Sequence, residues 1–198
     1  MISSATPTEF LIPRLDVRSP SISATASWIS DLRSFRGRIL WAEGRRPDFR
    51  EPEGFVDFDP IDLASWHLIL RDQTDQIVGC VRFAPLDEIS DVSQVRAVSQ
   101  ESAALILERY SCDERDVYEI GRMLIAREWQ NRGLGYFLGS TAAALGRELG
   151  RQLMWGVMGT RENQDKIALR FGWERGVHKT FTLPRYDDEV SIVVGRIR

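Results

Sequence analysis

The sequence predicts an α/β (α+β) domain in which helices flank a central mixed, mostly antiparallel sheet of about six or seven strands. Three observations support this class. Short apolar runs typical of strands occur in pairs joined by polar turns, as in hairpins. Helical spacing of apolar residues recurs between these runs. The chain has 198 residues and a hydrophobic content of 43%, which is sufficient for one domain with a substantial core.

Residues 1–26 are rich in Ser, Thr and Pro, and we expect a tail there with a possible edge strand at residues 9–17. A single domain is expected at residues 27–198. Three prolines and Gly54 indicate a loop at residues 45–60. The other predicted elements are strands at residues 66–70, 77–83, 117–125, 153–158, 178–183 and 189–194, and helices at residues 28–40, 100–109, 137–149 and 163–171.

The composition excludes several classes of partner. A net charge of −3 and a pI of about 5.5 argue against nucleic acid or an anionic membrane as a main partner. No apolar run is long enough to span a membrane, and residues 1–20 lack the pattern of a secretory signal. Two cysteines, Cys80 and Cys112, favour a reduced cytoplasmic protein over a disulfide framework. The cysteines and histidines show no metal-ligand spacing, so we expect no metal.

The most informative motif lies between the predicted strand at residues 117–125 and the helix that follows it. It reads Q-x-x-G-x-G and consists of Gln130, Asn131, Arg132, Gly133, Leu134 and Gly135. A glycine turn between a strand and a helix presents backbone N–H groups at the positive end of the helix, which suits a pyrophosphate. A Walker A loop would need a lysine that is absent here, and a dinucleotide fingerprint would need a small residue at Leu138. A glycine turn that merely ends a strand is the alternative.

In this context the motif resembles the R/Q-x-x-G-x-G/A signature of the GNAT superfamily of N-acyltransferases. The resemblance runs from about residue 28 to the end of the chain. It implies a GNAT-like fold with a splayed motif strand, and acetyl-CoA or another acyl-CoA as co-substrate. The residues implied at the coenzyme are the six motif residues, Tyr136, the strand residues Met123, Leu124 and Ile125, and Asn163, for which a helix N-cap is an equal alternative.

A second set of residues resembles the acyl-homoserine-lactone synthases and related N-acyl amino acid synthases of the GNAT-like group. Their pattern is a Phe and a Trp, then Asp-x-x-Asp, an Arg, and Glu-x-[SG]-Arg on the motif strand. The sequence departs from it at Gly121, where the lactone synthases usually carry Ser, and at Asp31, where they carry Arg. The matching residues are Phe35, Trp41, Asp59, Asp62, Arg82, Glu119 and Arg122.

Attack of an amine on a thioester suggests a role for each of these groups. We expect Glu119 to accept the amine proton and Arg122 to act beside it as a catalytic residue. Arg82 and Arg122 would hold a substrate carboxylate. Glu119 and Arg122 are three residues apart, so only a bulge at Gly121 would bring both to one site. The other candidate substrate-binding residues are Phe35, Trp41, Asp59 and Asp62, and a structural salt-bridge cluster is the alternative for the charged members.

We therefore expect an acyl-CoA-dependent N-acyltransferase that acts on a small, amino-acid-like amine, as a monomer or homodimer. One alternative is an acyl-homoserine-lactone-type synthase that uses S-adenosylmethionine and an acyl donor from acyl carrier protein or CoA. Another is a non-catalytic acyl-CoA-binding module. The second alternative stays open because Ala168 stands where many acetyltransferases of this superfamily carry a tyrosine that protonates the leaving thiolate.

Overall fold

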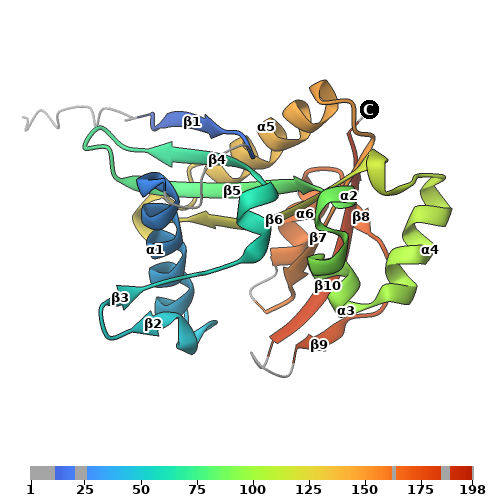
Figure 1. The fold of residues 1–198 in the computed structure, drawn as a ribbon, viewed down its shortest axis with the longest axis horizontal. Helices are drawn as coiled ribbons and strands as arrows, with labels where there is room; N and C mark the ends of the chain where they lie inside the picture. The colour runs from blue at the N-terminus through green and yellow to red at the C-terminus, as the bar shows by residue number, and fades with distance from the viewer. Residues whose placement is uncertain (1–11, 21–25, 162–163, 184–187, 198) are drawn as a thin grey trace, which may run out of the picture.

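The computed structural model describes residues 12–20, 26–161, 164–183 and 188–197. Their centre is one sheet of eight strands in the order β1-β4-β5-β6-β7-β10-β8, with β9 paired to β10 (Figure 1). Among these pairings only β6 with β7 is parallel. The expected mixed, mostly antiparallel sheet is confirmed, with more strands than the six or seven anticipated.

The strands of the sheet are β1 (Arg14–Arg18), β4 (Trp66–Arg71), β5 (Ile77–Pro85), β6 (Val117–Ile125), β7 (Leu153–Gly159), β8 (Glu174–Arg175), β9 (Phe181–Leu183) and β10 (Asp188–Arg196). A separate small hairpin is formed by β2 (Arg50–Glu51) and β3 (Gly54–Phe55). The α-helices are α1 (Ser27–Ala42), α2 (Leu86–Ile89), α3 (Gln94–Val98), α4 (Gln100–Tyr110), α5 (Leu134–Glu148) and α6 (Gln164–Arg170). Single 3-10 turns are η1 (Pro47–Phe49), η2 (Pro60–Ala64), η3 (Ser90–Val92), η4 (Glu114–Asp116) and η5 (Arg127–Trp129).

Several predicted boundaries need correction. The edge strand expected at residues 9–17 is β1, which pairs with β4 over Arg14–Arg18, and residues 9–11 lie outside the described residues. The stretch at residues 45–60 is not all loop, because it contains η1, β2 and β3. The short helices α2 and α3 and the strand β8 were not predicted. Each is only two to five residues long, which is too short to show a periodic pattern.

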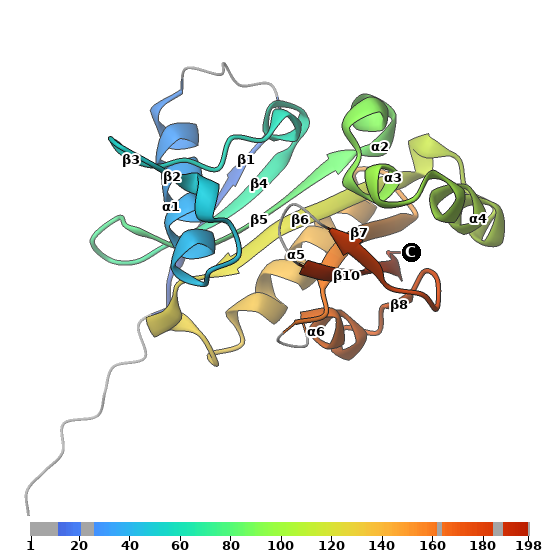
Figure 2. The ribbon, with the colours of Figure 1, turned by 90° about the horizontal axis from the view of Figure 1, so that it is seen from below.

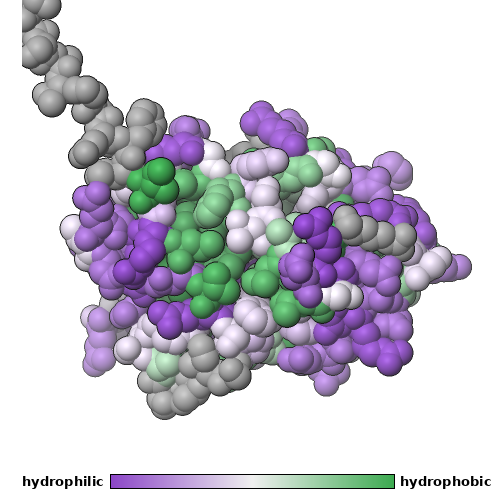
Figure 3. Space-filling view, turned by 90° about the horizontal axis from the view of Figure 1, so that it is seen from above, coloured by the Kyte–Doolittle hydropathy of each residue, from purple (hydrophilic) through white to green (hydrophobic). Residues whose placement is uncertain are grey.

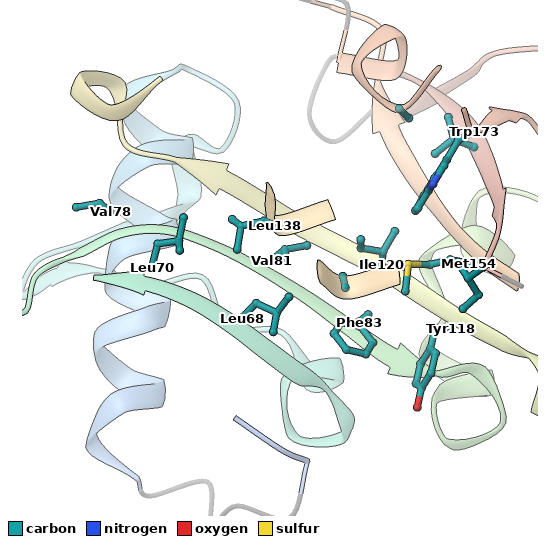
Figure 4. Close-up of a cluster of buried hydrophobic side chains, with 14 residues drawn as sticks. Leu68, Leu70, Val78, Val81, Phe83, Tyr118, Ile120, Leu138, Met154 and Trp173 are labelled. Carbon is teal, nitrogen blue, oxygen red and sulfur yellow. The ribbon is translucent and has the colours of Figure 1, made fainter. Parts of the chain in front are cut away.

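Successive side chains along each strand point to opposite faces of the sheet, so the core is divided between the two faces. On β4, Ile69 packs with α1, whereas its neighbours Leu68 and Leu70 pack with α5. Figure 4 shows the second group, with Leu138 of α5 close to Leu70 and Val81. Helices α2, α3 and α4 cover β7 and β10 through a third cluster that includes Trp155 and Ile192. The sheet therefore has helices on both faces, as Figures 1 and 2 show.

The face on the α5 side also carries exposed apolar side chains. Figure 3 views the molecule from this side and shows hydrophobic residues gathered near its middle. The exposed large apolar side chains include Val17 of β1, at 47%, and Phe137 of α5, at 44%. The buried charged groups described below lie on the other side of the sheet, where α1 packs.

Strands β6 and β7 separate after a short contact. Their parallel pairing is limited to three residue pairs and ends where Glu119 lies opposite Trp155. Beyond that point β7 continues to pair with β10 as far as Gly159, and the edge of β6 from Ile120 onward has no β7 partner. Gly156 lies at the separation, where an added Cβ would be 2.6 Å from the carbonyl oxygen of Ile120. The expected splayed motif strand is therefore present.

The other edge of β6 contains a bulge. Cys80 pairs with Leu124 and Arg82 pairs with Gly121, so one residue of β5 between these pairs lies opposite two of β6. Arg122 has φ of 53°, in the left-handed region that non-glycine residues rarely adopt. The bulge lies one residue beyond the position expected at Gly121. Because of the extra residue, Glu119 and Arg122 both face the side of the sheet opposite α5.

Candidate active site

A cavity of about 430 Å³ opens between the separated ends of β6 and β7. Its walls come from β6, from the end of β7, from the loop at residues 130–135, from α6 and from the C-terminal end of α1. Gln94, the first residue of α3, also lines it. The cavity exists because the two strands part, and it joins the unpaired edge of β6 to the beginning of α5.

The loop at residues 130–135 forms a turn that leads directly into α5. Asn131 and Gly133 both have positive φ, of 61° and 76°. The first helical hydrogen bond of α5 runs from the N–H of Phe137 to the carbonyl of Gly133 at 2.9 Å. The N–H groups of residues 134–136 therefore precede the helical ladder and are available to an anion. The side-chain amide of Gln130 donates to the carbonyl oxygen of Ile125 at 3.1 Å and ties the loop to β6.

Gly135 leaves the start of α5 uncrowded. A Cβ added there would meet only the sulfur of Met123, at 4.0 Å. Packing within the described residues therefore does not require glycine at this position. Gly135 lines the cavity in the first turn of α5, where a helix favours an anion.

A buried cluster of charged residues lies beside the cavity on the α1 face of the sheet. Asp62 is at its centre and accepts hydrogen bonds from three arginines at 2.7–2.9 Å. These arginines lie on α1 and β5, and a fourth lies on β6, so the cluster ties α1 and η2 to the sheet. We call it the Asp–Arg cluster; it consists of Asp57, Asp59, Asp62, Arg33, Arg36, Arg82 and Arg122.

Two arginines of the cluster differ in their access to the cavity. Arg82 donates to Asp62 at 2.9 Å and to Asp59 at 2.8 Å, and its side chain is only 3% exposed. Arg122 donates through Nε and Nη2 to the two carboxylate oxygens of Asp57, at 2.7 and 3.1 Å, and approaches Asp59 to 3.0 Å. Its side chain is 18% exposed and lines the cavity. Arg122 is thus the member of the cluster that a substrate can reach.

The arginines determine the ionisation of the cluster. Burial alone would raise the pKa of Asp59, but the guanidinium groups of Arg82 and Arg122 outweigh burial and hold that pKa below its usual range. Burial would likewise raise the pKa of Asp62. The three arginines around this carboxylate outweigh burial and hold its pKa well below the usual range. Both carboxylates are therefore ionised at neutral pH. Burial lowers the pKa of the nearby His67 to about 4, so this imidazole is neutral.

Glu119 does not line the cavity, because its carboxylate is turned toward α3. It accepts hydrogen bonds from the N–H of Gln94 at 2.8 Å, the hydroxyl of Ser93 at 2.5 Å and the indole N–H of Trp155 at 3.2 Å. A longer contact of 3.4 Å comes from the N–H of Val95. Only 5% of the residue is exposed. A carboxylate with this many fixed donors joins β6 to the beginning of α3.

Comparison with protein families identifies the fold that carries this site. The model of the acetyltransferase (GNAT) domain matches residues 36–139, just over half of the chain. The chain belongs to the GNAT acetyltransferase family. It is therefore an N-acyltransferase, as the loop motif predicted. A comparison with the sequences of curated proteins gave no match.

Solved structures agree with this assignment of the GNAT fold. The CoA-dependent acyl-homoserine lactone synthase BjaI, solved with SAM and isopentyl-CoA, is 17% identical with a TM-score of 0.68, over 94% of this chain and 84% of that one. TofI, in a ternary complex with an inhibitor and MTA, is 17% identical with a TM-score of 0.62, over 93% and 91%. ElaA of Escherichia coli is 13% identical with a TM-score of 0.63, over 92% and 99%.

The GNAT cofactor residues expected from the sequence mostly meet at the cavity. Arg132 of the loop and Tyr136, which follows it, are exposed and do not line the cavity. Asn163 lies outside the described residues. The expected residues that line the cavity are Met123, Leu124, Ile125, Gln130, Asn131, Gly133, Leu134 and Gly135.

The expected substrate residues are placed differently. Phe35 is 4% exposed and belongs to the core between α1 and the sheet. Trp41 packs against Phe55 at 5.2 Å between ring centroids and lies under the guanidinium of Arg50, away from the cavity lining. Asp59, Asp62 and Arg82 lie inside the Asp–Arg cluster. For these three and for Glu119 the geometry favours the structural role that the sequence left as an alternative.

Three residues near the site were missed by the sequence reasoning. Arg36 donates to Asp62 and to Asp57 from the apolar side of α1, and its helical spacing from Arg33 was a usable signal. Asp57 and Gln94 gave no signal, because an isolated acid in a loop and an isolated amide in a polar stretch match no pattern. Among the described residues there is no group of three or more side chains placed to hold a metal ion, and no helix able to cross a membrane.

We predict that Glu119→Gln lowers the free energy of unfolding by about 1–3 kcal/mol, measured by urea denaturation. The amide would turn an NH₂ group toward donors that are fixed on the backbone of α3 and on Trp155. Gln73→Glu, on the exposed turn between β4 and β5, provides a control of opposite charge change. Normal stability together with a turnover reduced a hundredfold or more would restore Glu119 as the general base.

Proposed function

We propose that the protein transfers an acyl group from acyl-CoA to the amine of a small, amino-acid-like acceptor by direct attack on the thioester. The observation that carries this proposal is the continuity of the cavity, which connects the free N–H groups at the start of α5 with the unpaired edge of β6. A pyrophosphate group and an extended arm joined to it would use both features at once.

The chain's own groups account for how the acyl donor is held. The N–H groups of residues 134–136 bind the pyrophosphate of CoA. The edge of β6 at Met123–Ile125 offers N–H and C=O groups to the amides of the pantetheine arm, much as a neighbouring strand would do. Because the arm leads from the loop back along β6 toward the start of the strand, the thioester comes to lie near Gly121 and Arg122. Backbone donors there stabilise the oxyanion that forms on the thioester carbonyl.

The charge of the Asp–Arg cluster favours an acceptor with a carboxylate. Four arginines face three aspartates in the cluster, which leaves one positive charge in excess. Arg122 brings that charge to the cavity wall. The amine attacks the thioester carbonyl, its proton passes to water, and the CoA thiolate leaves. Residue 168 supplies no acid, because alanine has no ionisable group and Ala168 is fully buried in the core.

A second candidate function is an acyl-homoserine-lactone-type synthase that uses acyl-CoA and S-adenosylmethionine. The observation in its favour is the apolar lining of the cavity on the side of β7 and α6, which offers room for an acyl chain longer than acetyl. The residues of that lining are Val157, Met158, Ile167 and Phe171. S-adenosylmethionine carries both an amine and a carboxylate, so it meets the same requirement at Arg122.

We predict that Gly135→Asp weakens the binding of acetyl-CoA at least about tenfold in calorimetry. The added carboxylate places a negative charge in the first turn of α5, beside the N–H groups that the pyrophosphate would use, while the fold has room for its Cβ. The melting temperature should be unchanged or higher, because an acidic residue in the first turn of a helix is favourable. Ser140→Asp, on an exposed turn of the same helix, should leave the affinity unchanged. Unaltered affinity in Gly135→Asp would remove the loop from the coenzyme site.

We predict that amines carrying a carboxylate are the best acceptors. Release of CoA thiol from acetyl- and decanoyl-CoA would be followed with methionine, glutamate, S-adenosylmethionine and spermidine as amines. An acceptor without a carboxylate makes no charge-assisted hydrogen bond to Arg122, at a cost of about 1.5–3 kcal/mol or roughly tenfold to a hundredfold in kcat/KM. Spermidine as the best acceptor would contradict this assignment. Preference for decanoyl-CoA with S-adenosylmethionine would favour the second candidate.

A further inference from the structure

Gln94 is a polar residue of the cavity wall that comes from α3. It begins α3, is half-buried and lines the cavity. Figures 1 and 2 place α3 toward the start of β6, while the loop and α5 follow its end. If the coenzyme enters at the loop and its arm follows β6, the reacting end of the acyl donor lies on the Gln94 side.

The backbone of Gln94 is held in a fixed relation to β6. Its N–H donates to Glu119, and the Ser93 hydroxyl donates to the same carboxylate. The indole of Trp155 on β7 completes this arrangement. Glu119 therefore ties α3 to both strands at the point where they separate. This gives Glu119 a positioning role that acts through Gln94.

The side-chain amide of Gln94 has one preferred orientation. Its Nε2 donates to Asp59 at 3.2 Å. Asp59 is kept ionised by its arginine neighbours and can only accept, so the NH₂ group must face it. The carbonyl oxygen Oε1 then points toward Gly121, 3.9 Å from the position of an added Cβ. Within the described part of the chain, no residue donates a hydrogen bond to this oxygen.

We propose that Oε1 of Gln94 accepts a hydrogen bond from the acceptor amine and directs its lone pair at the thioester carbonyl. This inference rests on the proposed function. The amine nitrogen forms the new C–N bond, the C–S bond breaks, CoA leaves as the thiolate, and the amine proton passes to water. The amide of Gln94 takes no proton. With Arg122 beside it, Gln94 completes a subsite for a molecule that carries an amine and a carboxylate close together.

The test places a thiol where the amine would bind. Gln94→Cys is incubated with bromoacetyl-CoA, and the modified peptide is found by mass spectrometry. The thiolate attacks the bromomethyl carbon, a C–S bond forms, the C–Br bond breaks and bromide leaves. That carbon lies one bond beyond the thioester carbonyl, which offsets the shorter reach of cysteine. We expect labelling at position 94 at least roughly tenfold faster than at Cys112, and suppression by excess CoA.

Two controls make the result decisive. Gln100→Cys, on the exposed first turn of α4, reports the reaction of an accessible thiol outside the cavity and should be insensitive to CoA. Calorimetry with acetyl-CoA shows whether each variant still binds the coenzyme. Binding without CoA-sensitive labelling at position 94 would overturn the role of Gln94 and leave the proposed function intact. Failure of the wild-type protein to bind acetyl-CoA would overturn both.

A second variant tests the same proposal in case Gln94→Cys does not fold. Gln94→Leu keeps the size of the side chain and removes its hydrogen-bonding groups. We expect the acceptor KM to rise about tenfold while the affinity for acetyl-CoA stays within about twofold of wild type. An unchanged acceptor KM, or an equal loss of affinity for both substrates, would contradict the proposal.

Discussion

The separation of β6 from β7 after Glu119 is the constraint on which the rest of the site depends. Up to that residue the two strands pair, and beyond it β7 stays with β10 while β6 stays with β5. Unsatisfied backbone groups are costly when they are buried, so an unpaired strand edge has to face a ligand or solvent. Here it faces the cavity, and the chain brings the loop at residues 130–135 to the end of the same edge.

The Asp–Arg cluster holds the other side of this opening in place. Buried ion pairs contribute little net stability, but loss of one partner is costly because it leaves a charge unpaired. Each aspartate of the cluster contacts at least two arginines, so α1 and η2 cannot move away from the sheet without breaking several such pairs. The bulge at Arg122 costs about 1–3 kcal/mol in backbone strain. It persists because the Arg122 side chain donates hydrogen bonds to both carboxylate oxygens of Asp57.

The sequence predicted the long elements well, and it predicted the glycine turn between β6 and α5. The strand at residues 117–125 was predicted with the observed bounds, because its apolar run is long and bounded by polar residues. The helix after the loop starts at Leu134 rather than at residue 137, since two glycines at its beginning weaken the helical pattern. Helix α3 was missed because five residues cannot show a period, and its position depends on Glu119, which is distant in sequence.

The roles of the charged residues were harder to predict. The motif identified Asp59, Asp62, Arg82 and Glu119 as a group, and they are indeed close to the site. Which of them faces the cavity depends on the bulge and on partners such as Asp57 and Ser93, which no pattern in the sequence connects to them. The motif therefore pointed to the region of the cavity, whereas tertiary contacts decide that Arg122 and Gln94 line it.

The central claim is that acyl-CoA lies along the open edge of β6 with its pyrophosphate at the start of α5. Hydrogen exchange of backbone amides, measured with and without acetyl-CoA, tests this most directly. The account predicts slower exchange at residues 120–125 and 133–136 on binding, and little change in β1, which lies at the far edge of the sheet. Protection confined to other elements, with these amides unaffected by saturating acetyl-CoA, would contradict it.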